Sequence, residues 1–267
     1  MLRQPVVAGQ FYPGGKQALI SELMRLIFKT QKKKKAKGVI VPHAGYAYSG
    51  GITGNVFGRI DVPRAALILG PNHHGQGSPL ALFPEGEWLT PLVASPIDSE
   101  LNGLLIKKCR YLKEDSTAHR FEHSLEVILP FLQILNPEIT FSAICLGLDD
   151  FEILRATGEG IAAAIRESSM DVLIVASSDM THYEPDISVR RKDDLALSRI
   201  LAFDPEGLLQ VCRSERISMC GAVAVAVMLA ALRELGATRA ELLSYGTSGD
   251  ITGDIRQVVG YAGVLIE

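Results

Sequence analysis

The stretch DVLIVASSDMTHY, residues 171–183, decides the fold of this chain. Its apolar run Val172–Ala176 is typical of a strand that is buried on both faces, as the strands of parallel sheets are. The loop at the carboxyl end of this strand then begins at Ser177 and contains Asp179 and His182. Open α/β sheets bind their ligands at this end of their strands, so we expect functional residues there.

The other apolar segments alternate between strand-like and helix-like patterns, which predicts a three-layer α/β domain. Glycine and proline separate the segments, and Pro130 is expected to kink the helix in which it lies. Strands are predicted at 38–45, 65–70, 139–146, 172–176, 241–246 and 258–266. Helices are predicted at 16–30, 98–111, 119–135, 150–167, 190–213 and 218–235, and residues 75–95 form a hairpin or an irregular excursion.

The composition is that of one globular domain. The chain has 267 residues without a linker or a low-complexity segment, so we expect a single domain over residues 1–267. A hydrophobic fraction of 47% is sufficient for a substantial core. The net charge is −3, and the one lysine run, QKKKKAKG at 31–38, is interpreted as a solvated turn. Both observations argue against a protein that binds nucleic acid.

The chain is expected to be cytoplasmic and not embedded in a membrane. The opening MLRQPVVAGQFYPGG lacks the charged and apolar regions of a signal peptide. The longest uncharged apolar run, Met219–Leu232, is shorter than the roughly 20 residues that cross a bilayer. Four cysteines without C-x-x-C spacing are expected to be reduced thiols, namely Cys109, Cys145, Cys212 and Cys220.

One of these cysteines has a distinctive position. The segment SMCGAVAVAVMLAALREL, residues 218–235, is a helix-length apolar run with Cys220 in its first turn and Gly221 directly behind. The positive end of the helix dipole favours the thiolate, which is the form that binds metals and attacks electrophiles. The alternative is a small buried cysteine that packs a core helix, since free cysteine is among the most buried residue types.

Histidines gather at the predicted strand ends. Four of the six, His43, His73, His74 and His182, lie at or just past the end of a strand. Neutral imidazoles suit iron, copper and zinc, and the Cys220 thiolate would add a softer, charged ligand. Two histidines and one anionic residue leave positions open for a substrate or for oxygen. Together these residues predict a mononuclear metal site.

Each histidine also has a structural interpretation. His43 would be hydrogen-bonded within a turn. His73 and His74 are adjacent and point in different directions, so that one ligates while the other supports it or faces solvent. His182, three residues after Asp179, either forms a local pair that holds the loop or acts as an acid/base histidine that the carboxylate controls.

The remaining polar candidates favour structural roles. His123 has Glu122 and Glu126 nearby and is interpreted as structural, and His119 is expected to be solvated. The aspartates of TSGDITGD, residues 247–254, are expected to cap a helix or a turn.

Six blocks of sequence, taken in order, resemble the Memo family: HAGYAYSG, GPNHHG, EHSLEVILPFLQ, SSDMTHY, SMCGA and TSGDITGD. Bacterial and archaeal members are also called the B protein of the AmmeMemoRadiSam system. The resemblance extends from VAGQFYPG near the start to VVGYAGVLI at the end, which is essentially the whole chain. It implies a fold similar to class III extradiol dioxygenases, a single α/β domain around a mixed central sheet.

The resemblance also implies a site. In the dioxygenases two histidines and a glutamate hold a non-haem iron, and the Memo pattern is similar with cysteine at the third position. Carried over by motif, the metal ligands would be His43, His74 and Cys220, with iron or copper as the cofactor. His182 falls where the dioxygenases keep an acid/base histidine, and Asp179 lines the same pocket. Three further residues are expected at the substrate: Tyr46, His73 and His123.

These expectations lead to three hypotheses. The first is a metal-dependent, oxidoreductase-like protein with an open His/His/Cys pocket and an unknown substrate. Replacing a carboxylate by a thiolate favours softer chemistry, so ring-opening activity does not transfer with the fold. The second is a non-catalytic binding or adaptor module that recognises a small molecule, a peptide or a radical SAM protein. The third is a hydrolase assisted by zinc.

Overall fold

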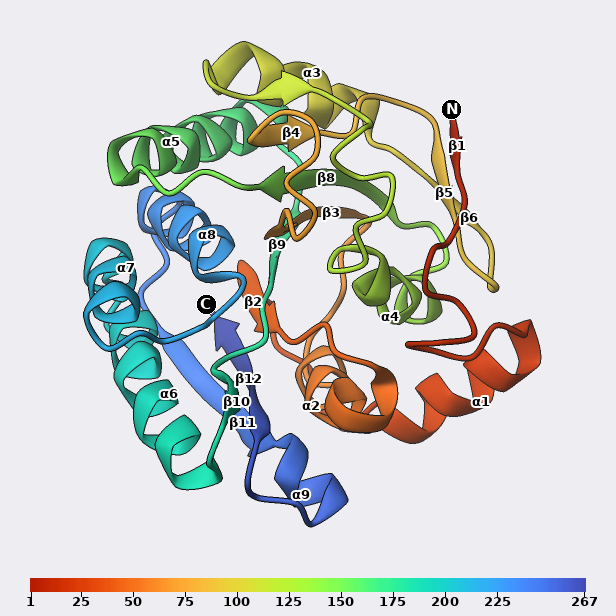
Figure 1. Cartoon of the computed structure of the whole chain (residues 1–267). Coiled ribbons are helices and arrows are strands. Elements are labelled where there is room, and N and C mark those ends of the chain that lie inside the picture. The colour runs from red at the N-terminus through yellow and green to blue at the C-terminus, as the bar shows by residue number, and fades with distance from the viewer.

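The computed structural model describes residues 1–267, and a nine-stranded sheet runs through its centre (Figure 1). Four of its strands are parallel and adjacent, in the order β2-β9-β3-β8. All of their residues except Thr140 are buried, which explains their continuous apolar sequences. These strands are Gly38–Val41 (β2), Val172–Ser177 (β9), Ala65–Pro71 (β3) and Thr140–Leu146 (β8).

Antiparallel strands extend this parallel core on both sides, so the sheet is mixed, as expected. On one side β2 pairs with β12, which also pairs with β11 and β10. On the other side β8 pairs with β4, and β4 pairs with β7 in parallel. The added strands are Val258–Ile266 (β12), Ala240–Thr247 (β11), His182–Glu184 (β10), Leu80–Leu82 (β4) and Lys113–Glu114 (β7).

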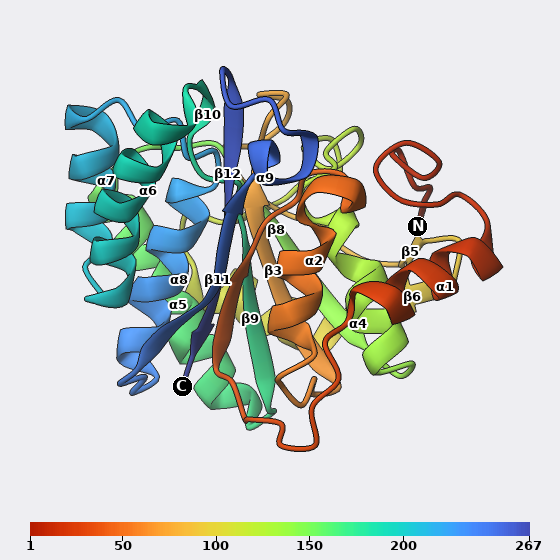
Figure 2. The ribbon, with the colours of Figure 1, turned by 90° about the horizontal axis from the view of Figure 1, so that it is seen from below.

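Helices cover both faces of the sheet, which confirms the three-layer α/β prediction (Figures 1 and 2). Side chains alternate between the faces: Leu67 and Leu69 enter one buried cluster, whereas Ala66 and Ile68 enter the other. The first cluster packs against Ser99–Lys108 (α3), Phe151–Ser168 (α5), Asp186–Leu201 (α6), Pro205–Ser214 (α7) and Ala222–Glu234 (α8). The second packs against Lys16–Leu26 (α1), Tyr46–Phe57 (α2), Glu126–Ile128 (η1) and Leu129–Leu135 (α4), and Ser248–Thr252 (α9) joins β11 to β12.

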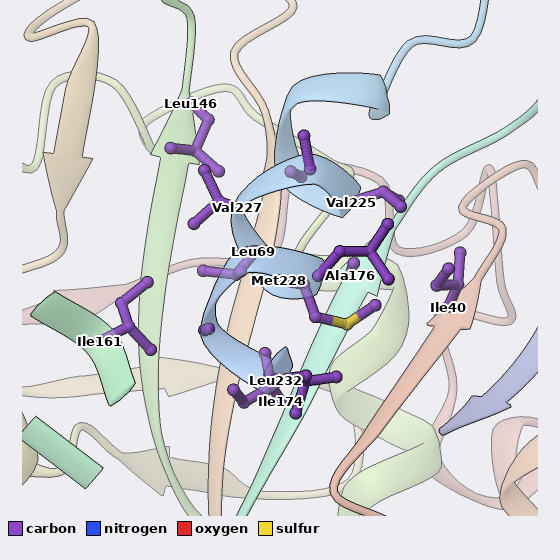
Figure 3. Close-up of a cluster of buried hydrophobic side chains, with 14 of the residues drawn as sticks. Ile40, Leu69, Leu146, Ile161, Ile174, Ala176, Val225, Val227, Met228 and Leu232 are labelled. Atoms are coloured by element: carbon purple, nitrogen blue, oxygen red, sulfur yellow. The ribbon is translucent and has the colours of Figure 1, made fainter. Parts of the chain in front are cut away.

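The α8 helix is buried along almost its whole length against the sheet and α5. Its side chains Val225, Val227 and Met228 lie among those of the parallel strands, including Leu69 and Ala176 (Figure 3). This packing explains why its sequence is apolar on every side. No helix in the structure combines the length and the apolar character that crossing a membrane requires.

The chain's first residues lie beside a small separate sheet. Residues 75–95, predicted as a hairpin or an irregular excursion, contain β4 and Glu87–Leu89 (β5), and β5 pairs with Ala94–Pro96 (β6) in an antiparallel hairpin. Leu2–Arg3 (β1) adds to β5 in parallel. From there the N-terminal segment runs toward α1, seen as the red loop in Figure 2.

Three predicted helices have different bounds in the structure. Residues 119–125 are not helical, and Pro130 lies in the first turn of α4, where a missing N–H costs nothing, so the predicted kink is wrong. The helices predicted around 190–213 are α6 and α7, and α6 begins earlier, at Asp186. The last predicted helix begins only at Ala222, so Cys220 precedes its first turn.

Candidate metal centre

Loops at the carboxyl ends of parallel strands bring two histidines together, and a third comes from the segment before η1. His43 follows β2, His73 follows β3, and His123 lies three residues before η1. One ring nitrogen of each lies within 4.8 Å of the other two. Neutral imidazoles ligate iron, copper and zinc. The three side chains therefore form a group that can hold one metal ion.

The ring of His43 has a defined tautomer. Ser177 Oγ donates its only proton to the carbonyl oxygen of Ser124, at 2.7 Å. It must therefore accept the hydrogen bond from His43 Nδ1, also at 2.7 Å. Nε2 then carries no proton and keeps its lone pair. Burial and the neighbouring His73 lower the pKa of His43 to about 3, so the ring is neutral at pH 7.

His73 is oriented in the same way by Glu122. Glu122 Oε1 lies 2.8 Å from His73 Nδ1, and Oε2 accepts from the backbone N–H of His73 at 2.7 Å. Burial alone would raise the pKa of Glu122, but the hydrogen bonds from His73 and Ser124 outweigh it and hold the pKa below its ordinary value. An ionised carboxylate only accepts, so His73 Nδ1 carries a proton, and in the neutral ring Nε2 keeps its lone pair. Such a carboxylate–histidine pair is typical of metal ligands.

His123 has no comparable partner. Its Nδ1 lies 3.6 Å from Glu122 Oε1, which is beyond hydrogen-bonding distance. Its ring stacks on His73 with 4.8 Å between centroids and meets His43 edge-on at 5.5 Å. Burial and the nearby His43 lower the pKa of His123 to about 4. The third imidazole is therefore neutral and is held by ring packing.

Cys220 borders this group. Its Sγ lies 3.2 Å from His43 Nε2. At Gly221 a Cβ atom would fall 2.4 Å from the carbonyl oxygen of Ser177, so glycine is needed for this close approach. Burial and the nearby Asp179 carboxylate raise the pKa of the Cys220 thiol. The predicted preference for the thiolate is therefore wrong for the pocket alone, because Cys220 precedes the first turn of α8 and burial disfavours the charged form. A coordinated cation removes that proton.

Asp179 lies in the loop after β9, as expected, and His182 follows this loop as the first residue of β10. Asp179 Oδ1 accepts from the backbone N–H groups of His43, at 2.8 Å, and Ala44, at 3.2 Å. Burial raises the pKa of Asp179 despite these hydrogen bonds. His182 Nδ1 donates to the carbonyl oxygen of Ser218 at 2.9 Å, so that in the neutral ring Nε2 is the proton acceptor. The partner of His182 is thus Ser218 rather than Asp179.

These side chains line one open cavity of about 780 Å³. All six chemically active residues described above contribute to its wall, and no lysine or arginine does. Much of the remaining wall is formed by the polar residues Gln10 and Ser218 and by aromatic and aliphatic side chains, namely Phe11, Tyr48, Tyr183, Val259 and Tyr261. The cavity can therefore take a ligand with an apolar or aromatic body beside the imidazole group.

Two residues expected at the site lie elsewhere. His74, which motif transfer assigned as a ligand, is exposed, with Nε2 3.0 Å from the carbonyl oxygen of Phe121. His73, expected at the substrate, occupies the position beside His43 instead. Tyr46 is only 3% exposed and donates from its hydroxyl to the carbonyl oxygen of Val127, at 2.8 Å. Tyr46 is therefore part of the core and does not reach the cavity.

Sequence reasoning missed the residues that orient the imidazoles. Glu122 was noted only as a neighbour of His123, and Ser177 only as the start of a loop. Glu122 lies in the polar sequence HRFEH, residues 119–123, so nothing in the sequence marks it as a buried carboxylate. For Ser177 no sequence signal distinguishes it from Ser178.

Two structural predictions outside the cavity have opposite outcomes. His119 is fully buried between the rings of Phe83 and Trp88, with Nε2 3.1 Å from the carbonyl oxygen of Ala81, so the prediction that it is solvated is wrong. Asp250 forms a capping box with Thr247 at the start of α9, which confirms its predicted capping role.

Comparison with known proteins places this chain in a family. The sequence profile described as Memo-like protein matches residues 3–265. MEMO1 family proteins of Methanopyrus kandleri and Aquifex aeolicus are each 39% identical to this chain. The alignments cover 99% of this chain in both cases, and 99% and 98% of the two relatives, respectively. A MEMO1 family protein of Thermotoga neapolitana is 38% identical over 100% of both chains.

A solved structure shares the fold at low sequence identity. The crystal structure of an uncharacterized protein from Escherichia coli K12 matches with a TM-score of 0.56 and 13% identity, over 85% of this chain and 99% of that one. At such low identity the likeness concerns the fold alone. The sequence profile and the relatives, in contrast, match along nearly the entire chain, and on that ground the chain belongs to the Memo family.

Proposed function

We propose that this chain is a metal-dependent, oxidoreductase-like protein that holds one iron or copper ion in the cavity. One observation carries the proposal: His43 and His73 each commit their Nδ1 proton to an oxygen acceptor, so that both keep an Nε2 lone pair beside the same cavity. Metal-ligating histidines in proteins are oriented in this way.

His123 and Cys220 are the two further donors that we assign. The ring of His123 is neutral and packs against both other imidazoles, and the sulfur of Cys220 lies beside His43. Three imidazoles with a sulfur suit iron, copper and zinc better than magnesium or calcium, which prefer oxygen ligands. When bound, such an ion supplies redox or Lewis-acid chemistry.

The chain's own residues have separate tasks in this proposal. His182 Nε2 accepts or returns a proton at the ligand, because its Nδ1 is already engaged by Ser218. Asp179 holds the backbone of His43 and Ala44 in place through Oδ1. The aromatic wall binds the body of a small organic ligand and excludes water from it.

The test compares variants of the two adjacent histidines, His73 and His74. The protein is purified anaerobically, and its bound iron, copper and zinc are measured for the wild type, His73→Ala and His74→Ala. We expect about one ion per chain in the wild type and in His74→Ala, and a loss of about tenfold or more in His73→Ala. Equal metal content in the two variants would contradict the proposal, because only His73 belongs to the group.

Related measurements would distinguish the proposal from two other functions. A colourless protein that carries only zinc would favour the zinc-assisted hydrolase. Binding of a peptide or of a radical SAM partner that is unchanged in Cys220→Ser would favour the non-catalytic binding module. In the oxidoreductase proposal Cys220→Ser lowers metal affinity, because a hydroxyl is a poorer ligand for these ions than a thiolate.

A further inference from the structure

We infer that the N-terminal segment Val6–Tyr12 positions the third imidazole of the metal group, with Phe11 as the contact residue and Glu126 as its anchor. The inference rests on the proposed function, because it assigns a task to residues around His123. It concerns positioning residues, since neither Phe11 nor Glu126 is a metal donor in that proposal.

His123 needs such support because no hydrogen bond orients its ring. His43 and His73 are oriented by Ser177 and Glu122, respectively. The ring of His123 is confined between its stack on His73 and the edge of Phe11, whose centroid lies 4.9 Å away at an interplanar angle of 62°. Phe11 is therefore an aromatic side chain that packs against this ring from outside the histidine group.

Backbone hydrogen bonds hold Phe11 in this position. Its N–H donates to the carbonyl oxygen of Val7 at 2.9 Å, and its carbonyl oxygen accepts from the N–H of Tyr46 at 2.8 Å. Gly9 turns the segment with φ of 82°, a conformation that side chains other than glycine rarely adopt. The segment is thus a closed turn that is tied to the start of α2.

Glu126 anchors the turn to the segment that carries His123. It is 1% exposed, and its carboxylate accepts from the backbone N–H groups of Val6 and Val7 and from the hydroxyl of Tyr12, at 2.7 to 3.1 Å. It also binds Arg3 at 2.7 Å. A buried carboxylate with so many donors is rigid, because losing any one of them leaves a charge or a polar group unpaired.

Arg3 connects Glu126 to the backbone of the segment that contains Glu122. Its guanidinium donates to the carbonyl oxygens of Glu122 and His119, at 2.6 and 2.9 Å, while it binds Glu126. Arg3 therefore contacts Glu122, which orients His73, and Phe11 contacts His123. Arg3 thus contacts residues around the histidine group that lie more than 110 positions away from it in sequence.

Cobalt(II) titration tests the inference without any substrate. The dissociation constant and the visible d–d absorption are measured for the wild type, Phe11→Leu, Phe11→Tyr and the control Phe121→Leu, in which an exposed phenylalanine beside His74 is changed. We expect Phe11→Leu to bind about tenfold more weakly with a shifted absorption. Phe11→Tyr, which keeps the ring, and Phe121→Leu should match the wild type.

Two further variants, Glu126→Gln and His73→Ala, distinguish a failure of this inference from a failure of the proposed function. Glu126→Gln should change the absorption in the same direction as Phe11→Leu, because the anchor and the contact act on the same ring. Cobalt binding that His73→Ala weakens but Phe11→Leu leaves unchanged would overturn the inference and spare the proposed function. Cobalt binding that His73→Ala leaves unchanged would overturn the proposed function itself.

Discussion

His73 and Glu122 are joined at two points, since the carboxylate accepts from both the ring Nδ1 and the backbone N–H of the same residue. The ring and the backbone of His73 are therefore held by one buried group, which comes from a segment 49 residues away. Ser124 N donates to the same carboxylate at 2.9 Å, so the group is rigid in turn. This double contact explains why His73, and not its neighbour, faces the cavity.

Glu122→Gln is expected to weaken metal binding by about 10- to 100-fold. The amide keeps the shape of the carboxylate, but it removes the charge that favours a proton on His73 Nδ1 and a lone pair on Nε2. Metal affinity is measured by competition with a chelator, and Glu138→Gln, at an exposed position, is the control. Wild-type affinity in Glu122→Gln would show that the carboxylate does not orient a ligand.

Ser177→Ala removes the acceptor that sets the tautomer of His43. We expect metal affinity to fall about tenfold and the free energy of unfolding to fall by about 1 kcal/mol. Ser142→Ala is a matched control, since Ser142 is a buried strand serine whose hydroxyl has no hydrogen-bond partner. If the two variants bind metal equally well, the tautomer of His43 does not matter for the site.

Stability should decrease as the pH falls from about 6.5 toward 4. His43, His119 and His123 have pKa values of about 3, 4 and 4 in the folded protein, against an ordinary value of 6.5. In this window the unfolded chain binds more protons than the folded one, so protonation favours unfolding, by up to about 1.4 kcal/mol per pH unit for each histidine.

Urea unfolding of metal-free protein at several pH values measures this slope. Asp179 and Asp193 have pKa values that burial raises, so they oppose the histidines and make the net slope smaller than the sum. The substitution His119→Gln, at a residue outside the cavity, should reduce this slope by the contribution of one histidine. A free energy of unfolding that is constant across the window would contradict the burial of neutral imidazoles.

Tyr183→Asn is expected to stabilise the protein by about 1 kcal/mol. Tyr183 has a φ of 58° and its side chain is 72% exposed, so it bears left-handed backbone strain with little packing in return. Asparagine tolerates this conformation better. The check is urea unfolding beside Tyr48→Asn, which replaces an exposed tyrosine in α2 and should destabilise slightly. A destabilised Tyr183→Asn would mean that the ring packs more than its exposure indicates.

The sequence was sufficient to predict the four parallel strands, because their residues are buried on both faces and therefore form apolar runs. Residues 172–176 and 65–70 were predicted within one residue of their ends. The order β2-β9-β3-β8 could not be predicted from these runs, because it depends on which face each connecting helix covers. The site could still be placed at the carboxyl ends, since every such order brings them to one edge.

The individual ligands were harder to predict for a physical reason. His73 and His74 are neighbours with the same chemistry, and the choice between them is made by Glu122, which is distant in sequence. His123 was placed inside a predicted helix that in fact begins only at η1, so its loop position was hidden. His119 lies in the polar sequence HRFEH, yet the aromatic rings of distant strands bury it.

The contact between Cys220 and His43 joins positions 177 residues apart. During synthesis the histidines leave the ribosome first, and at roughly 5–20 residues per second the cysteine follows on the order of 10 to 35 s later. A nascent chain thus lacks the complete donor set until nearly all of it has emerged. In the proposed function, metal loading therefore follows synthesis of the chain, and the metal that is bound depends on the ions available in the cell at that time.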